Sequence, residues 1–287
     1  MTINFSLIIA TINRRNTLSH LLGSLAKQSY KNFEVLIIDQ NPSDYLIDII
    51  SRWESELNII HKNVPFKGLS RARNYGIKIA NSNILAFPDD DCHYESNTLK
   101  NVLDHFNKNK ETEILICQTK ESSNSIQKVI KQRNNFYKIN SINDLFMSKA
   151  NSISIFLKSN ILSRIEGELF DVNMGVGSGT IYGSSEETDL LLRLLKKRTK
   201  VFVHNNIFVC HPKTYPSPSK SYLYGLGRYK LIKKNKLSVI YYLLNLFYPL
   251  LNILIRFDFK NYKSYLATIF GRAGWEFLYP LYFKEKD

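Results

Sequence analysis

The first 110 residues alternate short apolar segments with amphipathic ones, and this alternation constrains the fold more than any other feature. Uninterrupted apolar runs such as Leu36-Ile37-Ile38 are typical of strands buried on both faces. Strands that alternate with helices predict an α/β fold with a mostly parallel sheet and helices on both of its faces. The expected strands are 5–10, 34–39, 57–61 and 84–87, and the expected helices include 45–53 and 69–80.

Three consecutive aspartates, Asp89, Asp90 and Asp91, follow the fourth expected strand. Their charges would repel one another unless a cation lies among them. Carboxylate oxygens suit Mg²⁺ or Mn²⁺, and the carboxyl ends of strands are where α/β sheets bind ligands. The pattern therefore indicates a metal-diphosphate site. An acidic surface loop or a helix N-terminus would also explain it.

A second acidic cluster, Glu186, Glu187 and Asp189, opens a helix expected over 186–197. Acidic residues in a first helical turn interact favourably with the helix dipole, and Asp189 has the spacing of an ion pair with Arg193. The functional alternative is that one of these carboxylates is a general base. The glycines between 175 and 179 fit a flexible loop, because their spacing matches neither the dinucleotide-binding motif nor the P-loop.

The last quarter of the chain is basic and aromatic. The chain carries 39 Lys and Arg against 25 Asp and Glu, and 13 of the basic but only 4 of the acidic residues lie from Pro212 onward, with more than half of the 17 tyrosines. Such a surface is typical of binding to anionic lipid headgroups. Residues 238–255 are uncharged but would span only about 27 Å as a helix, with basic residues on both sides. We expect an interfacial or re-entrant helix pair bent at Pro249, or alternatively a helical cap on the main domain.

Cysteine usage and the N-terminal residues indicate the compartment. Cys92, Cys117 and Cys210 show no metal-binding spacing and are odd in number, which fits a reducing compartment. The apolar run 5–10 is too short for a signal peptide. We expect a cytoplasmic protein, peripheral or monotopic on the inner face of the cell membrane.

Seven segments follow one another in a recognisable order along the chain. They are Ser6 to Arg14, Gln28, the strand 34–39, Gly68 to Gly76, the DxD-like Asp89 to Asp91, Phe170-Asp171 and Gly183 to Arg193. Over roughly residues 3–212, this order resembles inverting family 2 glycosyltransferases (GT2) with the GT-A fold. Ala10 and Ile12 replace the family's usual proline and tyrosine, and Glu187 stands where the family usually has aspartate.

The resemblance implies roles for individual residues. Asp91, together with Asp89, would bind Mn²⁺ or Mg²⁺, and His211 is positioned like a third metal ligand of some relatives. Glu187 takes the position of the catalytic base, with Glu186 and Asp189 as rivals. Asp39 would reach the uracil or thymine end of the nucleotide. The residues implied in donor binding are Thr11, Asn13, Asp39, Arg71, Arg73, Asp89 and Asp90.

The resemblance also implies domains and a reaction. A catalytic GT-A domain would cover 1–212, with a nucleotide-binding half at 1–118 and an acceptor-side half at 119–212, and a helical membrane-associating region would cover 213–287. The expected reaction moves a sugar from a nucleoside diphosphate, UDP first, to a hydroxyl of a glycan acceptor, polyprenyl-linked, in surface polysaccharide biosynthesis. No nucleic-acid partner is expected. The alternatives are a sugar-phosphate nucleotidyltransferase and a non-catalytic basic module that binds membranes or nucleic acid.

Overall fold

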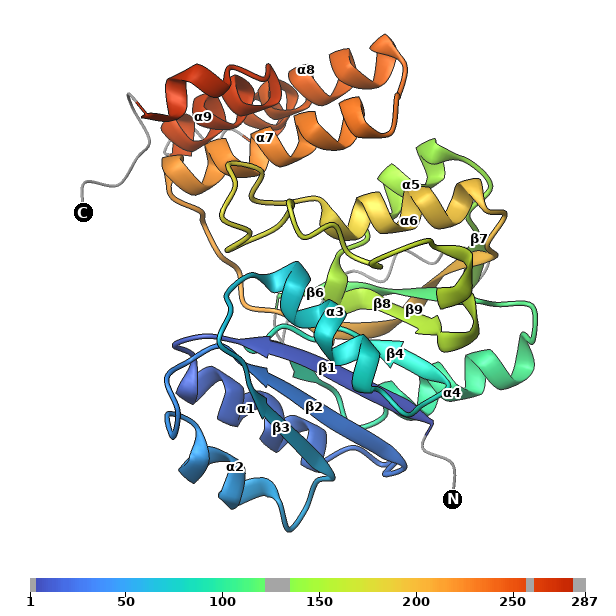
Figure 1. The fold of residues 1–287 in the computed structure, drawn as a ribbon. Coiled ribbons are helices and arrows are strands. Elements are labelled where there is room, and N and C mark those ends of the chain that lie inside the picture. Colours follow the sequence, from blue (N-terminus) through green and yellow to red (C-terminus); the bar gives the residue numbers. More distant parts are fainter. Residues whose placement is uncertain (1–3, 122–134, 257–260, 281–287) are drawn as a thin grey trace. The chain divides into compact units, whose positions relative to one another are not determined.

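The computed structural model describes residues 4–121, 135–256 and 261–280 (Figure 1). The chain divides into two compact units. The first comprises Met1–Phe66, Ala72–Leu169 and Leu194–Lys213, and the second comprises Lys67–Arg71, Phe170–Arg193 and Thr214–Asp287. Two segments from the middle of the chain therefore group with the C-terminal region.

Among the described residues of the first unit, nine strands form one sheet. Its strands are β1 (Phe5–Thr11), β2 (Phe33–Asp39), β3 (Ile59–Asn63), β4 (Ile84–Ala86), β5 (His93–Tyr94), β6 (Ile114–Lys120), β7 (Phe136–Lys138), β8 (Ile155–Lys158) and β9 (Val201–Cys210). They lie in the order β3-β2-β1-β4-β8-β6-β9-β5, and β7 also pairs with β9.

The sheet is mixed, so the expectation of a mostly parallel sheet is right only for its first part. β1 to β4 pair in parallel, whereas β8 inserts between β4 and β6 and runs antiparallel to both. β5 and β7 are also antiparallel to β9. A parallel neighbour needs a long crossover connection, usually a helix packed on the sheet. β8 instead follows the short helices α5 (Ile142–Ser148) and η1 (Ser152–Ser154).

Helices cover both faces of the parallel part. α1 (Arg15–Ala26), α2 (Ile47–Trp53) and α4 (Thr98–Lys108) share one hydrophobic core with Leu7 and Ile9 of β1. Ile8 points to the opposite face, since side chains alternate along a strand. There α3 (Leu69–Ile79) lies so close that a Cβ on Gly76 would come within 2.3 Å of Ile8 Cγ2. Glycine at this position therefore lets the helix pack directly on the strand.

The glycine-rich loop is held in place within the second unit. Gly175, Gly177 and Gly179 all have positive φ angles, of 94°, 71° and 77°. The Leu69 backbone N–H donates to the Val176 carbonyl at 3.0 Å, and the Ser70 hydroxyl donates to the Met174 carbonyl at 2.7 Å. The start of α3 thus anchors a segment that the sequence indicates only as a flexible loop.

The C-terminal region is helical, with α7 (Pro218–Lys234), α8 (Val239–Arg256) and α9 (Tyr262–Arg272). The expected helix pair is wrong, because α8 is one helix with Pro249 inside it. A proline leaves the carbonyl four residues earlier without its helical donor. That carbonyl belongs to Asn245, and the Arg272 guanidinium donates to it at 2.7 Å. Arg272 thus replaces the hydrogen bond that Pro249 cannot make.

Candidate active site

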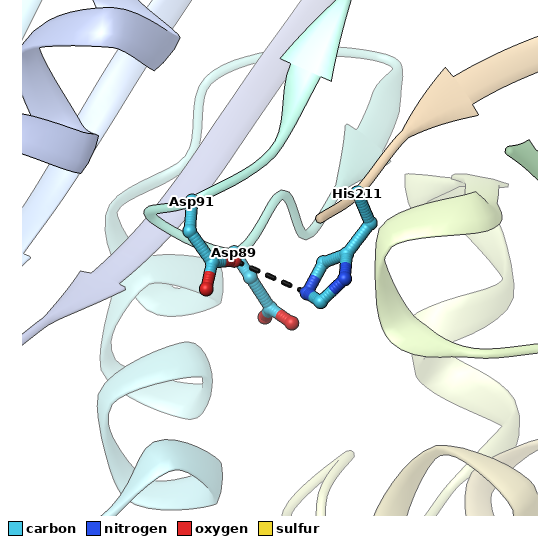
Figure 2. A group of neighbouring side chains, drawn as sticks. All are labelled: Asp89, Asp91 and His211. Atoms are coloured by element: carbon cyan, nitrogen blue, oxygen red, sulfur yellow. Dashed lines mark ion pairs between the residues drawn. The ribbon is translucent and has the colours of Figure 1, made fainter. Parts of the chain in front are cut away.

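Three potential metal ligands meet where two strands of the first unit end. Asp89 and Asp91 come soon after β4, and His211 directly follows β9. Antiparallel pairing of β5 with β9 sets His93 opposite Cys210, which brings these distant parts of the sequence together. Figure 2 shows the three side chains directed toward one another, and one ligand atom of each lies within 4.8 Å of the other two.

The donor set fits a divalent cation. Asp91 Oδ1 is buried without a hydrogen bond of acceptable geometry from any described residue, although it lies 3.1 Å from His211 Nε2. His211 Nδ1 donates to the Pro212 carbonyl at 2.7 Å, since a carbonyl can only accept. This bond orients the ring and leaves Nε2 for the cluster. Two carboxylates and an imidazole suit Mn²⁺ or, with more water, Mg²⁺.

Arginines hold the other carboxylate oxygens of the cluster. Arg73 is buried, and its Nη2 donates to Asp89 Oδ1 and to Ser152 Oγ, both at 2.8 Å. Arg14 Nη1 donates to Asp91 Oδ2 at 3.2 Å. The neighbouring His211 lowers the pKa of Asp91, and Asp91 raises the pKa of His211. Neither Ser152 nor Arg14 is identified from the sequence as a site residue, and no motif marks Ser152.

Asp90 bonds to a neighbouring strand and does not join the three ligands. The Thr11 hydroxyl, at the end of β1, donates to Asp90 Oδ2 at 2.7 Å. Burial raises the pKa of Asp90 to about 6, against the opposing effect of this hydrogen bond. Asp89 and Asp91 thus point to the cluster with His211, whereas Asp90 points to Thr11.

Two other expected donor-binding residues meet in one network at the ends of β1 and β2. Asp39 is 1% exposed, and its Oδ1 accepts from the backbone N–H and the side-chain amide of Asn41 at 2.9 and 2.6 Å. Its Oδ2 lies 3.0 Å from His61 Nε2. The Asn13 backbone N–H donates to Asn41 Oδ1 at 2.6 Å. The sequence gives no sign of Asn41 or His61. Arg71 belongs to the second unit, where it is exposed.

The acidic residues at the start of α6 (Glu186–Lys196) lie in the second unit and differ in their surroundings. Asp189 is fully buried and accepts from Arg193 Nε at 2.9 Å, Lys234 Nζ at 2.8 Å and Asn235 Nδ2 at 2.9 Å. The expected ion pair with Arg193 is therefore present, within a larger network. Both Asp189 oxygens are already engaged.

Glu186 and Glu187 point into different environments. Glu186 is 5% exposed, and a Cβ added to Gly175 would come within 3.0 Å of its carboxyl carbon. Glu187 is half-buried and close enough to Arg228 to affect its titration. Burial lowers the pKa of Arg228, and the Glu187 carboxylate opposes that effect. Of the three acidic side chains, Glu187 is the most open to a ligand.

The fold is that of GT-A glycosyltransferases. The crystal structure of S. aureus TarS 1–349 matches 94% of this chain and 92% of its own, with a TM-score of 0.61 at 16% identity. The mannosyltransferase PcManGT from Pyrobaculum calidifontis, in complex with GDP-Man and Mn²⁺, matches 98% of this chain and 88% of its own, with a TM-score of 0.67 at 13% identity.

The family follows from the sequence itself. The profile of Glycosyl transferase family 2 matches residues 6–162, more than half of the chain, and the chain therefore belongs to this family. It is 36% identical over 101 residues to the Escherichia coli UDP-Glc:alpha-D-GlcNAc-diphosphoundecaprenol beta-1,3-glucosyltransferase WfaP. That match covers 35% of this chain and 40% of WfaP, so the chain spans less than half of that relative's length.

Proposed function

We propose that the protein is a metal-dependent, inverting glycosyltransferase that moves a sugar from UDP to a hydroxyl of a lipid-linked glycan. The observation that carries this proposal is the cluster of Asp89, Asp91 and His211 at the strand ends of a family 2 chain. Solved relatives hold UDP-GlcNAc or GDP-Man, and WfaP acts on a diphosphoundecaprenol-linked sugar. Family membership favours sugar transfer over the nucleotidyltransferase and the non-catalytic module.

The side chains of the first unit would divide the work of holding the donor. Asp91, Asp89 and His211 would hold Mn²⁺ or Mg²⁺, which when bound neutralises the charge on the departing diphosphate. Arg73 and Arg14 fix the two carboxylates, so the ligands are oriented before the donor arrives. The nucleoside would lie at the ends of β1 and β2, beside Thr11, Asn13 and Asp39.

Glu187 is the best candidate for the base within the second unit. The base must accept a proton from the acceptor hydroxyl as its oxygen attacks the anomeric carbon. Asp189 is committed to three donors, and Glu186 is buried against Gly175. Glu187 alone of the three combines partial exposure with the nearby cation Arg228.

Calorimetry with UDP tests the metal site. We expect UDP to bind in the presence of Mn²⁺ and to lose most of its affinity in EDTA. His211→Ala should weaken Mn²⁺-dependent binding about 10- to 100-fold, while His20→Ala, at an exposed position of α1, should leave it unchanged. Binding of UDP that is the same with and without Mn²⁺ would contradict the proposal.

We also propose that the protein works at an anionic membrane surface on the cytoplasmic side, through α8. No helix in the described ranges is both long and apolar enough to cross a bilayer. α8 nevertheless exposes a row of large apolar side chains at helical spacing, which suits insertion between lipid headgroups. Its most exposed members are Val239 (67%), Ile240 (64%), Leu244 (61%), Leu251 (53%) and Phe247 (51%). Lys233 and Lys236 precede this row and supply attraction to anionic lipid.

Flotation with phosphatidylglycerol vesicles tests this role of α8. Leu244→Ser/Phe247→Ser should reduce vesicle binding at least about tenfold, because each inserted side chain contributes about 1–2 kcal/mol. The control, Ile47→Ser/Met147→Ser, removes apolar side chains that are at least as exposed, at 51% and 78%, but lie in the first unit. Equal vesicle binding by both double variants would exclude α8 as the membrane contact.

A further inference from the structure

A cavity of about 610 Å³ lies beside α7 within the second unit. Its walls come from α7, from residues between 171 and 182, and from Glu276 after α9. Lys230, Lys233 and Lys234 line it together, since residues three and four apart are neighbours on a helix surface. One wall of the cavity is therefore strongly basic.

Two of these lysines keep their charge available. Lys234 is neutralised, because its Nζ lies 2.7 Å from Asp171 and 2.8 Å from Asp189. Lys230 Nζ lies 4.8 Å from the centre of the Tyr182 ring, and Lys233 Nζ lies 5.2 Å from that of Tyr229. Neither makes an ion pair with any residue in the described ranges. A lysine beside a ring remains able to bind a phosphate.

The two tyrosines form fixed walls. The Tyr182 hydroxyl donates to Glu276 Oε1 at 3.0 Å, and its side chain packs against the buried Tyr222 cluster. A Cβ on Gly274 would come within 2.4 Å of the Tyr229 ring, so that ring lies directly on the backbone. Both rings are partly exposed and can contact a sugar, and Glu276 offers an acceptor to its hydroxyls. The cavity thus combines groups for a phosphate with groups for a sugar.

The cavity adjoins the acidic start of α6. Asp171 lines the cavity, and Lys234 connects it to Asp189 through the two ion pairs. Asp189 lies two residues from Glu187 on the same helix. A ligand in the cavity would therefore lie beside the helix that carries the proposed base.

We propose that this cavity binds the phosphorylated end of the acceptor, a glycosyl diphosphate. Lys230 and Lys233 would hold the phosphates, and Tyr182 and Tyr229 would lie against the sugar. The inference rests on the proposed function, because it identifies the acceptor of that reaction. A phospholipid headgroup or free pyrophosphate offers the same phosphates but no sugar for the aromatic walls and Glu276.

Calorimetry of the intact protein in EDTA, without donor, tests the proposal. The probe is octyl N-acetylglucosaminyl diphosphate. Lys230→Ala/Lys233→Ala should weaken its binding at least about tenfold, or 1.4 kcal/mol. Lys220→Ala/Lys263→Ala removes two exposed lysines of α7 and α9 that do not line the cavity, and should bind the probe as the unaltered protein does.

Parallel titrations identify which part of the probe is recognised. Inorganic pyrophosphate and dihexanoylphosphatidylglycerol should both bind at least about tenfold more weakly than the probe, which is 1.4 kcal/mol. No binding of the probe, an equal loss in both double variants, or equally tight binding of either comparison compound would overturn the proposal. These titrations measure binding and no turnover. If the protein binds the probe in this cavity but transfers no sugar, the proposed function is refuted and the proposed binding site is not.

Discussion

Asp91→Asn is expected to reduce metal-dependent sugar transfer at least about 100-fold, the order of effect seen when one charge-stabilising group is removed from a transition state. Asp91 is the best-prepared ligand, because its Oδ1 is buried without a hydrogen bond from the described residues and its Oδ2 is fixed by Arg14. Asparagine keeps the shape but removes the charge that a divalent cation needs. Turnover of a UDP-sugar with Mn²⁺, including slow hydrolysis of the donor, provides the measurement.

A matched substitution separates this effect from a general loss of negative charge. Asp104→Asn removes an exposed aspartate of α4 that pairs only with Lys100, one turn away, among its described contacts. It should leave turnover within about twofold of the unaltered protein, since such pairs contribute little. If Asp91→Asn kept similar turnover, the cluster of Figure 2 would not be the metal site of the reaction.

The sequence predicts the parallel part of the fold because that part is locally encoded. Each expected strand there lies within about two residues of β1 to β4, since apolar runs mark buried strands without reference to the rest of the chain. β8 is different. Its antiparallel position between β4 and β6 depends on partners distant in the sequence, and its own four residues, Ile155–Lys158, carry no sign of direction.

The residues of the site likewise divide into those that local sequence patterns indicate and those that depend on distant contacts. Acidic residues at Asp89 to Asp91 are visible as a pattern, and His211 follows from the family resemblance. Asp189 has an ion pair that spacing predicts, but its burial depends on Lys234 and Asn235, which arrive from α7 and the residue after it. Likewise, Pro249 indicates a helix break unless Arg272 is known to satisfy the Asn245 carbonyl. Contacts between distant segments cannot be deduced from local spacing.

Glu187→Gln is expected to lower kcat about 100- to 10,000-fold, the usual contribution of a general base. The amide keeps the size of the side chain but cannot accept the proton of the acceptor hydroxyl. The KM for the donor should change little, since the residues proposed to bind diphosphate and metal belong to the first unit. Steady-state kinetics with a glycosyl diphosphate acceptor measures both quantities, and Glu111→Gln, at an exposed position of the first unit, is the control.

If Glu187 is the base, substitutions of the two rival carboxylates should affect stability and kcat differently. Asp189→Asn removes the charge between Arg193 and Lys234, which should lower the free energy of unfolding by about 3 kcal/mol. Its defect should therefore appear as a lower Tm, with kcat per folded molecule largely kept. Glu186→Gln keeps the side chain packed against Gly175 and should retain most activity. A large loss of kcat at an unchanged Tm in either rival, with Glu187→Gln still active, would move the base to that residue.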